Sequence, residues 1–129
     1  MVEISGILCD MNQIDKSVIL GVIEGLSAPY QSRYYAMYSS YFGGITTDPG
    51  LMLIPIDDHM VHSGDGIFEA FKCVDGKIYN MRAHMDRLLR SAATVELDLP
   101  CSIEDIESKV VETVRAGKNR DCTIRLYIS

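Results

Sequence analysis

The order of hydrophobic and polar residues changes its period in the middle of the chain. Residues 67–74 are rich in aromatic and β-branched side chains, which predicts a strand. Asp75-Gly76 follows, and this dipeptide suits a two-residue hairpin turn in which both residues have positive φ. Residues 77–81 are therefore the predicted return strand.

A helical period replaces the strand pattern after this hairpin. Between residues 84 and 97 the apolar positions recur at helical spacing, at Met85, Leu88, Leu89, Ala92 and Ala93. A different face of the same helix carries His84, Arg87 and Ser91. Residues 63–66, with two glycines, form a turn before the first strand that allows positive φ or close backbone approach. A basic side chain on a polar helix face beside a glycine turn is an arrangement that can hold a phosphate.

Further elements are expected on both sides of this region. Capping-box motifs, Asp10 with Gln13 and Ser102 with Asp105, begin two amphipathic helices. These helices are predicted at residues 11–26 and 102–116, the second ending at Gly117. Additional strands are predicted at residues 34–41, 51–56 and 123–129. We interpret the apolar face of the first helix as a packing surface.

Two charged residues on the predicted strands need an explanation. Both faces of strand 67–74 are mostly apolar, so we expect the sheet to be covered on both sides. Glu69 lies between apolar neighbours, where an unpaired carboxylate is too costly, and therefore requires a backbone donor, an arginine or a cofactor group. Arg125 faces away from the core with Tyr127, and such a cation suits either capture of a carboxylate or a surface ion pair.

The composition and the short motifs of the chain argue against a nucleic-acid binder, a membrane protein and a metalloprotein. The chain has 129 residues, which suits one domain, and its net charge of −6 argues against a nucleic-acid binder. Its sequence has no apolar run of bilayer length and no basic signal-peptide start, so we expect a cytoplasmic protein without membrane attachment. The four cysteines have no CxxC spacing, which favours reduced thiols. Asp57, Asp58, His59 and His62 match no metal-ligand spacing, and we predict no metal site.

Several short motifs in order carry a resemblance to a known family. Residues 64–69, Gly-Asp-Gly-Ile-Phe-Glu, then a hairpin, then residues 84–88, His-Met-Asp-Arg-Leu, and Ser91-Ala92 resemble the N-terminal domain of class IV (fold type IV) pyridoxal-phosphate aminotransferases. This family includes branched-chain and D-amino-acid aminotransferases and aminodeoxychorismate lyase. The resemblance covers residues 34–129, which leaves 1–33 as an N-terminal extension. It implies an α+β fold, a mainly antiparallel sheet with helices packed on it.

The resemblance also implies roles for individual residues. Arg87 would contact the phosphate of pyridoxal 5'-phosphate, while Phe68, Arg125 and Tyr127 would bind the substrate. The family's catalytic lysine lies in a second domain, so no catalytic residue is assigned among Lys16, Lys72, Lys77, Lys109 and Lys118. We therefore predict that this chain is the N-terminal half of a two-domain enzyme and that its partner is a C-terminal catalytic domain. Because enzymes of this family usually dimerise, we expect the complete enzyme to be a homodimer. The 129-residue segment alone should be inactive.

The predicted function is transfer of an amino group from an amino acid to a 2-oxo acid, of the branched-chain or D-amino-acid type. Ala70 departs from the glycine that commonly follows Phe-Glu in branched-chain enzymes. Alternatives are the lyase activity, a non-catalytic assembly or ligand-binding domain of the same fold, and an unrelated enzyme built on Asp57, Asp58 and His62. Replacing Arg87 by Ala is expected to weaken cofactor binding more than folding.

Overall fold

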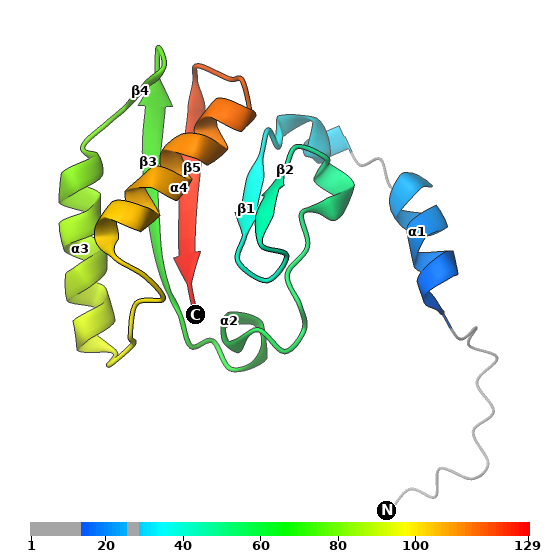
Figure 1. Cartoon of the computed structure of the whole chain (residues 1–129), viewed down its shortest axis with the longest axis horizontal. Helices are drawn as coiled ribbons and strands as arrows, with labels where there is room; N and C mark the ends of the chain where they lie inside the picture. The colour runs from blue at the N-terminus through cyan, green and yellow to red at the C-terminus, as the bar shows by residue number, and fades with distance from the viewer. Residues whose placement is uncertain (1–13, 26–28) are drawn as a thin grey trace, which may run out of the picture.

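The computed structural model describes residues 14–25 and 29–129, and its centre is a three-stranded antiparallel sheet. The strands lie in the order β4-β3-β5, and their bounds are Lys77–Ile78 for β4, Ile67–Val74 for β3 and Cys122–Ile128 for β5. Two helices, α3 (Met81–Thr94) and α4 (Ile103–Ala116), pack on this sheet (Figure 1). The fold is α+β, as the sequence predicted.

One face of the sheet carries the hydrophobic core. Side chains along β3 alternate strictly between buried and exposed, because successive strand residues point to opposite faces. The core joins β3 and β5 to both helices through Ile67, Phe71, Met85, Leu88, Ala92, Ile103, Ile106, Val110 and Ile128. The expectation that the sheet is covered on both sides is wrong for the described residues, since α3 and α4 pack on the same face and the opposite face is exposed.

Both predicted turns around β3 are present. Asp75 and Gly76 have φ of 51° and 74°, as the hairpin required. In the glycine turn, Gly64 has φ of 78°, and a Cβ on Gly66 would lie 3.1 Å from the carbonyl oxygen of Ile128. Gly64 therefore provides the positive φ, and Gly66 allows the turn to lie close to the backbone of β5.

The helix after the hairpin begins and ends earlier than its apolar stripe suggested. The return strand stops at Ile78, since Asn80 adopts the left-handed conformation with φ of 50° and α3 starts at Met81. At the other end, Glu96 has φ of 55°, which is incompatible with a helix continuing to Leu97. The predicted bounds of 84–97 are thus about one turn too late at each end.

Helix α4 begins as its capping box predicted. The hydroxyl of Ser102 accepts a hydrogen bond from the backbone N–H of Asp105 at 3.1 Å and donates one to its carboxylate at 2.8 Å. Gly117 follows the helix, but its φ of −68° is helical, and Lys118 takes the left-handed conformation instead. Gly117 is needed for space, because a Cβ there would lie 3.0 Å from the Cβ of Tyr35.

The part of the chain before the glycine turn consists of short elements. They are α1 (Lys16–Gly25), η2 (Pro29–Arg33), β1 (Met37–Ser39), β2 (Gly44–Thr46), η3 (Pro49–Leu51) and α2 (His59–His62). Strands β1 and β2 form a separate hairpin, so the strand expected at 34–41 is shorter than predicted. No strand forms at 51–56, where Leu51 belongs to η3 and Pro55 has no N–H to donate to a neighbour.

Helix α1 forms, but it does not pack as predicted. The capping box at residues 10 and 13 lies outside the described residues, and the carboxylate of Asp15 instead accepts bonds from the N–H groups of Ser17 and Val18. The Ser17 hydroxyl, followed by these backbone bonds, lowers the pKa of Asp15. Every residue of α1 except the partly buried Ile23 is exposed to solvent, and no residue of this helix is buried.

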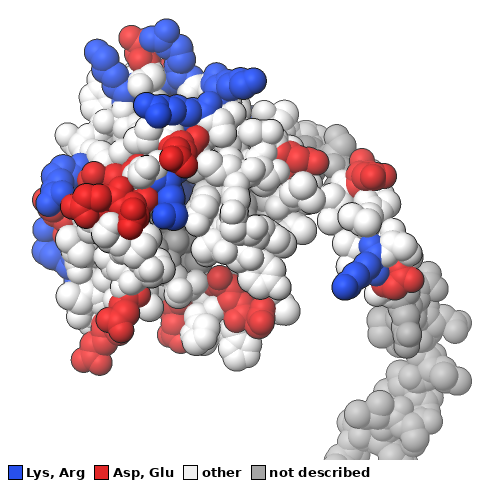
Figure 2. All heavy atoms as spheres, viewed as in Figure 1, with Lys and Arg blue, Asp and Glu red and all other residues white. Residues whose placement is uncertain are grey.

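Charge is distributed unevenly over the surface. Figure 2 shows lysine and arginine atoms gathered at the end of the molecule that carries the β3–β4 turn, where Arg120 forms an ion pair with Asp75. The visible face of the β1–β2 region carries mostly uncharged atoms. None of the helices in the described ranges is both long enough and apolar enough to cross a membrane.

Candidate functional site

A buried carboxylate under helix α3 is the centre of the candidate site. Glu69 is 1% exposed, and its two oxygens accept bonds from Arg87 Nε at 2.7 Å and Arg87 Nη2 at 2.5 Å. His84 Nδ1 lies 2.8 Å from the oxygen that Nη2 contacts. The expectation that Glu69 needs a partner is confirmed, and an arginine is that partner.

Secondary structure explains why these three side chains meet. Strand alternation directs Glu69 to the covered face, between Ile67 and Phe71. His84 and Arg87 are three residues apart on α3, so they are neighbours on one side of the helix. The ring of His84 also stacks on Phe71, with centroids 4.8 Å apart. The helical spacing places His84 on the correct face of α3, but it does not identify this histidine as a partner of Glu69.

The ion pair sets the charge state of the cluster. The hydrogen bonds from Arg87 lower the pKa of Glu69 and, although burial raises it, the contact with His84 lowers it further. The same pair raises the pKa of Arg87. Glu69 is therefore an anion at neutral pH, and Arg87 carries a permanent positive charge with 56% of its side chain exposed.

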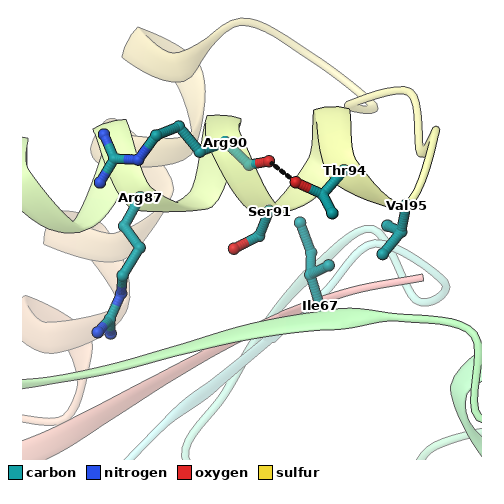
Figure 3. A pocket seen from close by; sticks show the side chains of 6 residues that line it. All are labelled: Ile67, Arg87, Arg90, Ser91, Thr94 and Val95. Carbon is teal, nitrogen blue, oxygen red and sulfur yellow. Dashed lines mark hydrogen bonds between the residues drawn. The ribbon is translucent and has the colours of Figure 1, made fainter.

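A shallow hollow of about 310 Å³ lies beside Arg87 at the edge of β3. Its lining residues are Ile67, Arg87, Arg90, Ser91, Thr94 and Val95. Figure 3 shows Arg87 extending from α3 toward β3, whereas Arg90 points away from the strand. Of the two arginines that line this hollow, Arg87 is therefore the one whose side chain is held against the sheet.

The three residues predicted to bind substrate lie together on the exposed face of the sheet. Phe68 is opposite Tyr127 in the β3–β5 register, and their rings are 6.2 Å apart. Arg125 is opposite Ala70, two pairs further along the register and on the same face. Because Glu69 points to the covered face, Arg87 does not share a surface with these three residues among the described parts of the chain.

One of the acidic residues before the glycine turn, Asp58, has a local structural role. Asp58 caps the short helix α2 by accepting a bond from the N–H of Met60 at 3.0 Å. Among residues 14–25 and 29–129, no three His, Cys, Asp or Glu side chains are grouped as metal ligands would be. The described cysteines, Cys73, Cys101 and Cys122, are free thiols.

Comparison with known proteins identifies the region that contains this site. Residues 66–129 match the family model described as amino-transferase class IV. Residues 66–129 therefore belong to the class IV aminotransferase family. The match begins at the glycine turn and includes β3, α3 and the three predicted substrate-binding residues.

Similar proteins and a solved structure match a larger part of the chain. A chloroplastic D-amino-acid transaminase from Arabidopsis thaliana is 42% identical over 97 residues, which is 75% of this chain and 26% of that protein. A D-alanine aminotransferase from Staphylococcus haemolyticus is 29% identical over 63% of this chain and 29% of its own length. The Escherichia coli branched-chain amino acid aminotransferase aligns with a TM-score of 0.55 at 25% identity, covering 60% of this chain and 27% of that structure. The chain thus spans roughly a quarter of the length of these three proteins.

Proposed function

We propose that this chain is the N-terminal domain of a pyridoxal-phosphate-dependent aminotransferase that moves an amino group from an amino acid to a 2-oxo acid. The observation that carries the proposal is Arg87, which lies in a family motif and is held against the sheet by Glu69. The names of the relatives support a D-amino-acid or branched-chain substrate.

The residues present fit one part of a pyridoxal-phosphate site. A guanidinium carries five N–H donors, and two donate to Glu69, so three remain to bind the oxygens of a phosphate. When bound, the cofactor would supply the electron sink that transamination requires. The contribution of Arg87 would be to fix the phosphate end of that cofactor.

The exposed sheet face fits a substrate surface. Arg125 would donate to the substrate carboxylate, and the rings of Phe68 and Tyr127 would contact its side chain. Lys72 also lies on this face, but no family motif marks it, and we place the catalytic lysine outside residues 1–129. A second domain covering this face would enclose the substrate residues.

Assembly and compartment belong to the same proposal. Exposed large apolar side chains on the sheet face and in the N-terminal part suit contact with a C-terminal domain and a second copy of the protein. We expect a homodimer in a reducing compartment such as the cytoplasm, where the free thiols of Cys73, Cys101 and Cys122 persist.

The test is borohydride reduction of the full-length protein that contains this segment, followed by peptide mapping by mass spectrometry. The expected result is one pyridoxyl adduct on a lysine outside residues 1–129. An adduct on Lys72 or another lysine of this segment would contradict the assignment of the lysine. Absence of any adduct from protein incubated with excess cofactor would support a non-catalytic domain of the same fold.

A further inference from the structure

We infer that Glu69 is a positioning residue, which fixes Arg87 so that the outer edge of its guanidinium faces the phosphate of the cofactor. The inference rests on the proposed function, because it assumes that Arg87 meets that phosphate. It assigns a task to a buried carboxylate that the family match leaves without one.

The geometry of the ion pair carries the argument. Glu69 bonds to Nε and Nη2, which are the side edge of the planar guanidinium. The remaining N–H groups, on Nη1 and Nη2, form the other edge and point away from the carboxylate. Two parallel hydrogen bonds thus determine both the position of the group and the direction of its free donors.

The burial of Glu69 supports a positioning role over a purely structural one. Its neighbours on the same face, Ile67 and Phe71, are apolar and well buried, so an apolar residue would satisfy the core at this position. Replacing buried ion pairs by apolar residues is often neutral or stabilising. A carboxylate at this position therefore gives geometric control of Arg87, whose side chain is otherwise half exposed and rich in rotamers.

His84 completes the arrangement from the same helix. Its Nδ1 contacts the oxygen of Glu69 that also accepts from Arg87 Nη2, and its ring is stacked on Phe71. The carboxylate is therefore held from two sides and cannot rotate to follow Arg87. Because the Glu69 carboxylate is fixed, the free N–H groups of the Arg87 guanidinium are fixed in direction as well.

The negative charge of Glu69 repels a phosphate, whereas its positioning of Arg87 would favour phosphate binding. The direction in which phosphate affinity changes when Glu69 is replaced therefore tests the inference. A carboxylate that only neutralised Arg87 would weaken phosphate binding, and its removal would strengthen that binding. A carboxylate that positions Arg87 would have to strengthen phosphate binding, and its removal would weaken it.

The experiment compares pyridoxal 5'-phosphate with pyridoxal, which lacks the phosphate, as ligands of the full-length apoprotein. The measured quantity is the ratio of the two dissociation constants, obtained by fluorescence or calorimetric titration. Glu69→Gln is expected to reduce the preference for the phosphorylated ligand about tenfold or more, by analogy with the effect of removing a group that orients a metal-binding side chain. Glu69→Asp, which retains the charge, should restore part of that preference.

Matched variants separate this effect from folding and from net charge. Glu112→Gln makes the same substitution at an exposed site on α4 and should leave the ratio unchanged. Val110→Ala perturbs the core on α4, at a residue that does not line the hollow, and should affect both ligands equally. A loss of affinity for both ligands in Glu69→Gln, with the ratio unchanged, would show a structural role and overturn the inference, as would an increase in the ratio.

Variants of Arg87 distinguish failure of the inference from failure of the proposed function. Arg87→Lys retains the charge but cannot form the two parallel bonds, and it should lower the ratio as Glu69→Gln does. In an Arg87→Lys background, Glu69→Gln should have little further effect on the ratio. If the Arg87 variant leaves the ratio unchanged, the phosphate assignment itself is wrong. If it lowers the ratio and Glu69→Gln does not, only the positioning role is wrong.

Discussion

The two parts of the chain on either side of the glycine turn differ in how they bury apolar residues. Every buried hydrophobic side chain of the described residues lies between Ile67 and Ile128, in the sheet and its two helices. Most of the large exposed apolar side chains lie before residue 62, many of them in α1 and around β1 and β2. The second part has a core of its own, whereas the first part presents apolar surface that its own elements do not cover.

The largest expected effect tests this difference directly. Met85 is fully buried between α3 and the sheet, so Met85→Ala should destabilise the chain by about 2–5 kcal/mol. Val22→Ala in α1 removes a half-exposed side chain and should change the free energy of unfolding by less than about 0.5 kcal/mol. Urea unfolding followed by circular dichroism measures both. Similar costs for the two variants would mean that α1 packs on the core.

The same difference explains what the sequence could predict. Strand β3, its Asp75-Gly76 turn and helix α4 were predicted well, because local pattern, turn chemistry and core packing agree there. In the first part, the strand expected at 51–56 failed because its apolar residues have no partner strand among the described residues. Exposed apolar residues in this part of the chain therefore give the same sequence pattern as residues buried in a core.

The candidate site was predicted only in part, for a related reason. The need of Glu69 for a partner followed from burial, which strand alternation reveals. The identity of that partner depends on how α3 lies across β3, which sequence spacing does not define. His84 could have been found from its place three residues before Arg87 on the same helix face.

The second prediction concerns the ion pair in the well-packed part. Arg87→Ala leaves the buried Glu69 with His84 as its remaining side-chain partner, so we expect a loss of about 1–3 kcal/mol at pH 7. The structure thus adds a folding cost to the effect on cofactor binding. Arg90→Ala, on the same helix but pointing away from β3, is the control and should cost less than about 0.5 kcal/mol.

The loss in Arg87→Ala should depend on pH. Because Arg87 lowers the pKa of folded Glu69, the stabilisation is present above the unfolded value of about 4.3 and is lost as pH falls through the folded pKa. Unfolding measured from pH 7 down to pH 3 should show the two proteins converging below about pH 4. A difference that stayed constant through this range would contradict the ion-pair explanation.

A smaller effect is expected at the junction between the two parts. A Cβ on Gly66 would lie 3.1 Å from the carbonyl oxygen of Ile128 and 3.4 Å from Met60 Cβ, so Gly66→Ala should cost about 1–2 kcal/mol. Gly44→Ala in β2 meets no described atom within 4 Å and should change stability by less than about 0.5 kcal/mol. Thermal unfolding of both variants measures how much tighter the packing is at the junction.

The smallest effect gives the sharpest test of whether α1 folds together with the sheet. Gly21 lies inside α1 with open space around it, so Gly21→Ala should stabilise this helix by up to about 1 kcal/mol. Since α1 buries no residue, we expect slower amide hydrogen exchange within residues 16–25 and no change in the urea midpoint of the core. A midpoint that rose with the helix would mean that the two parts unfold as one unit. The exposed apolar face of α1 would then already be part of a shared core, and the contrast between the two parts would be wrong.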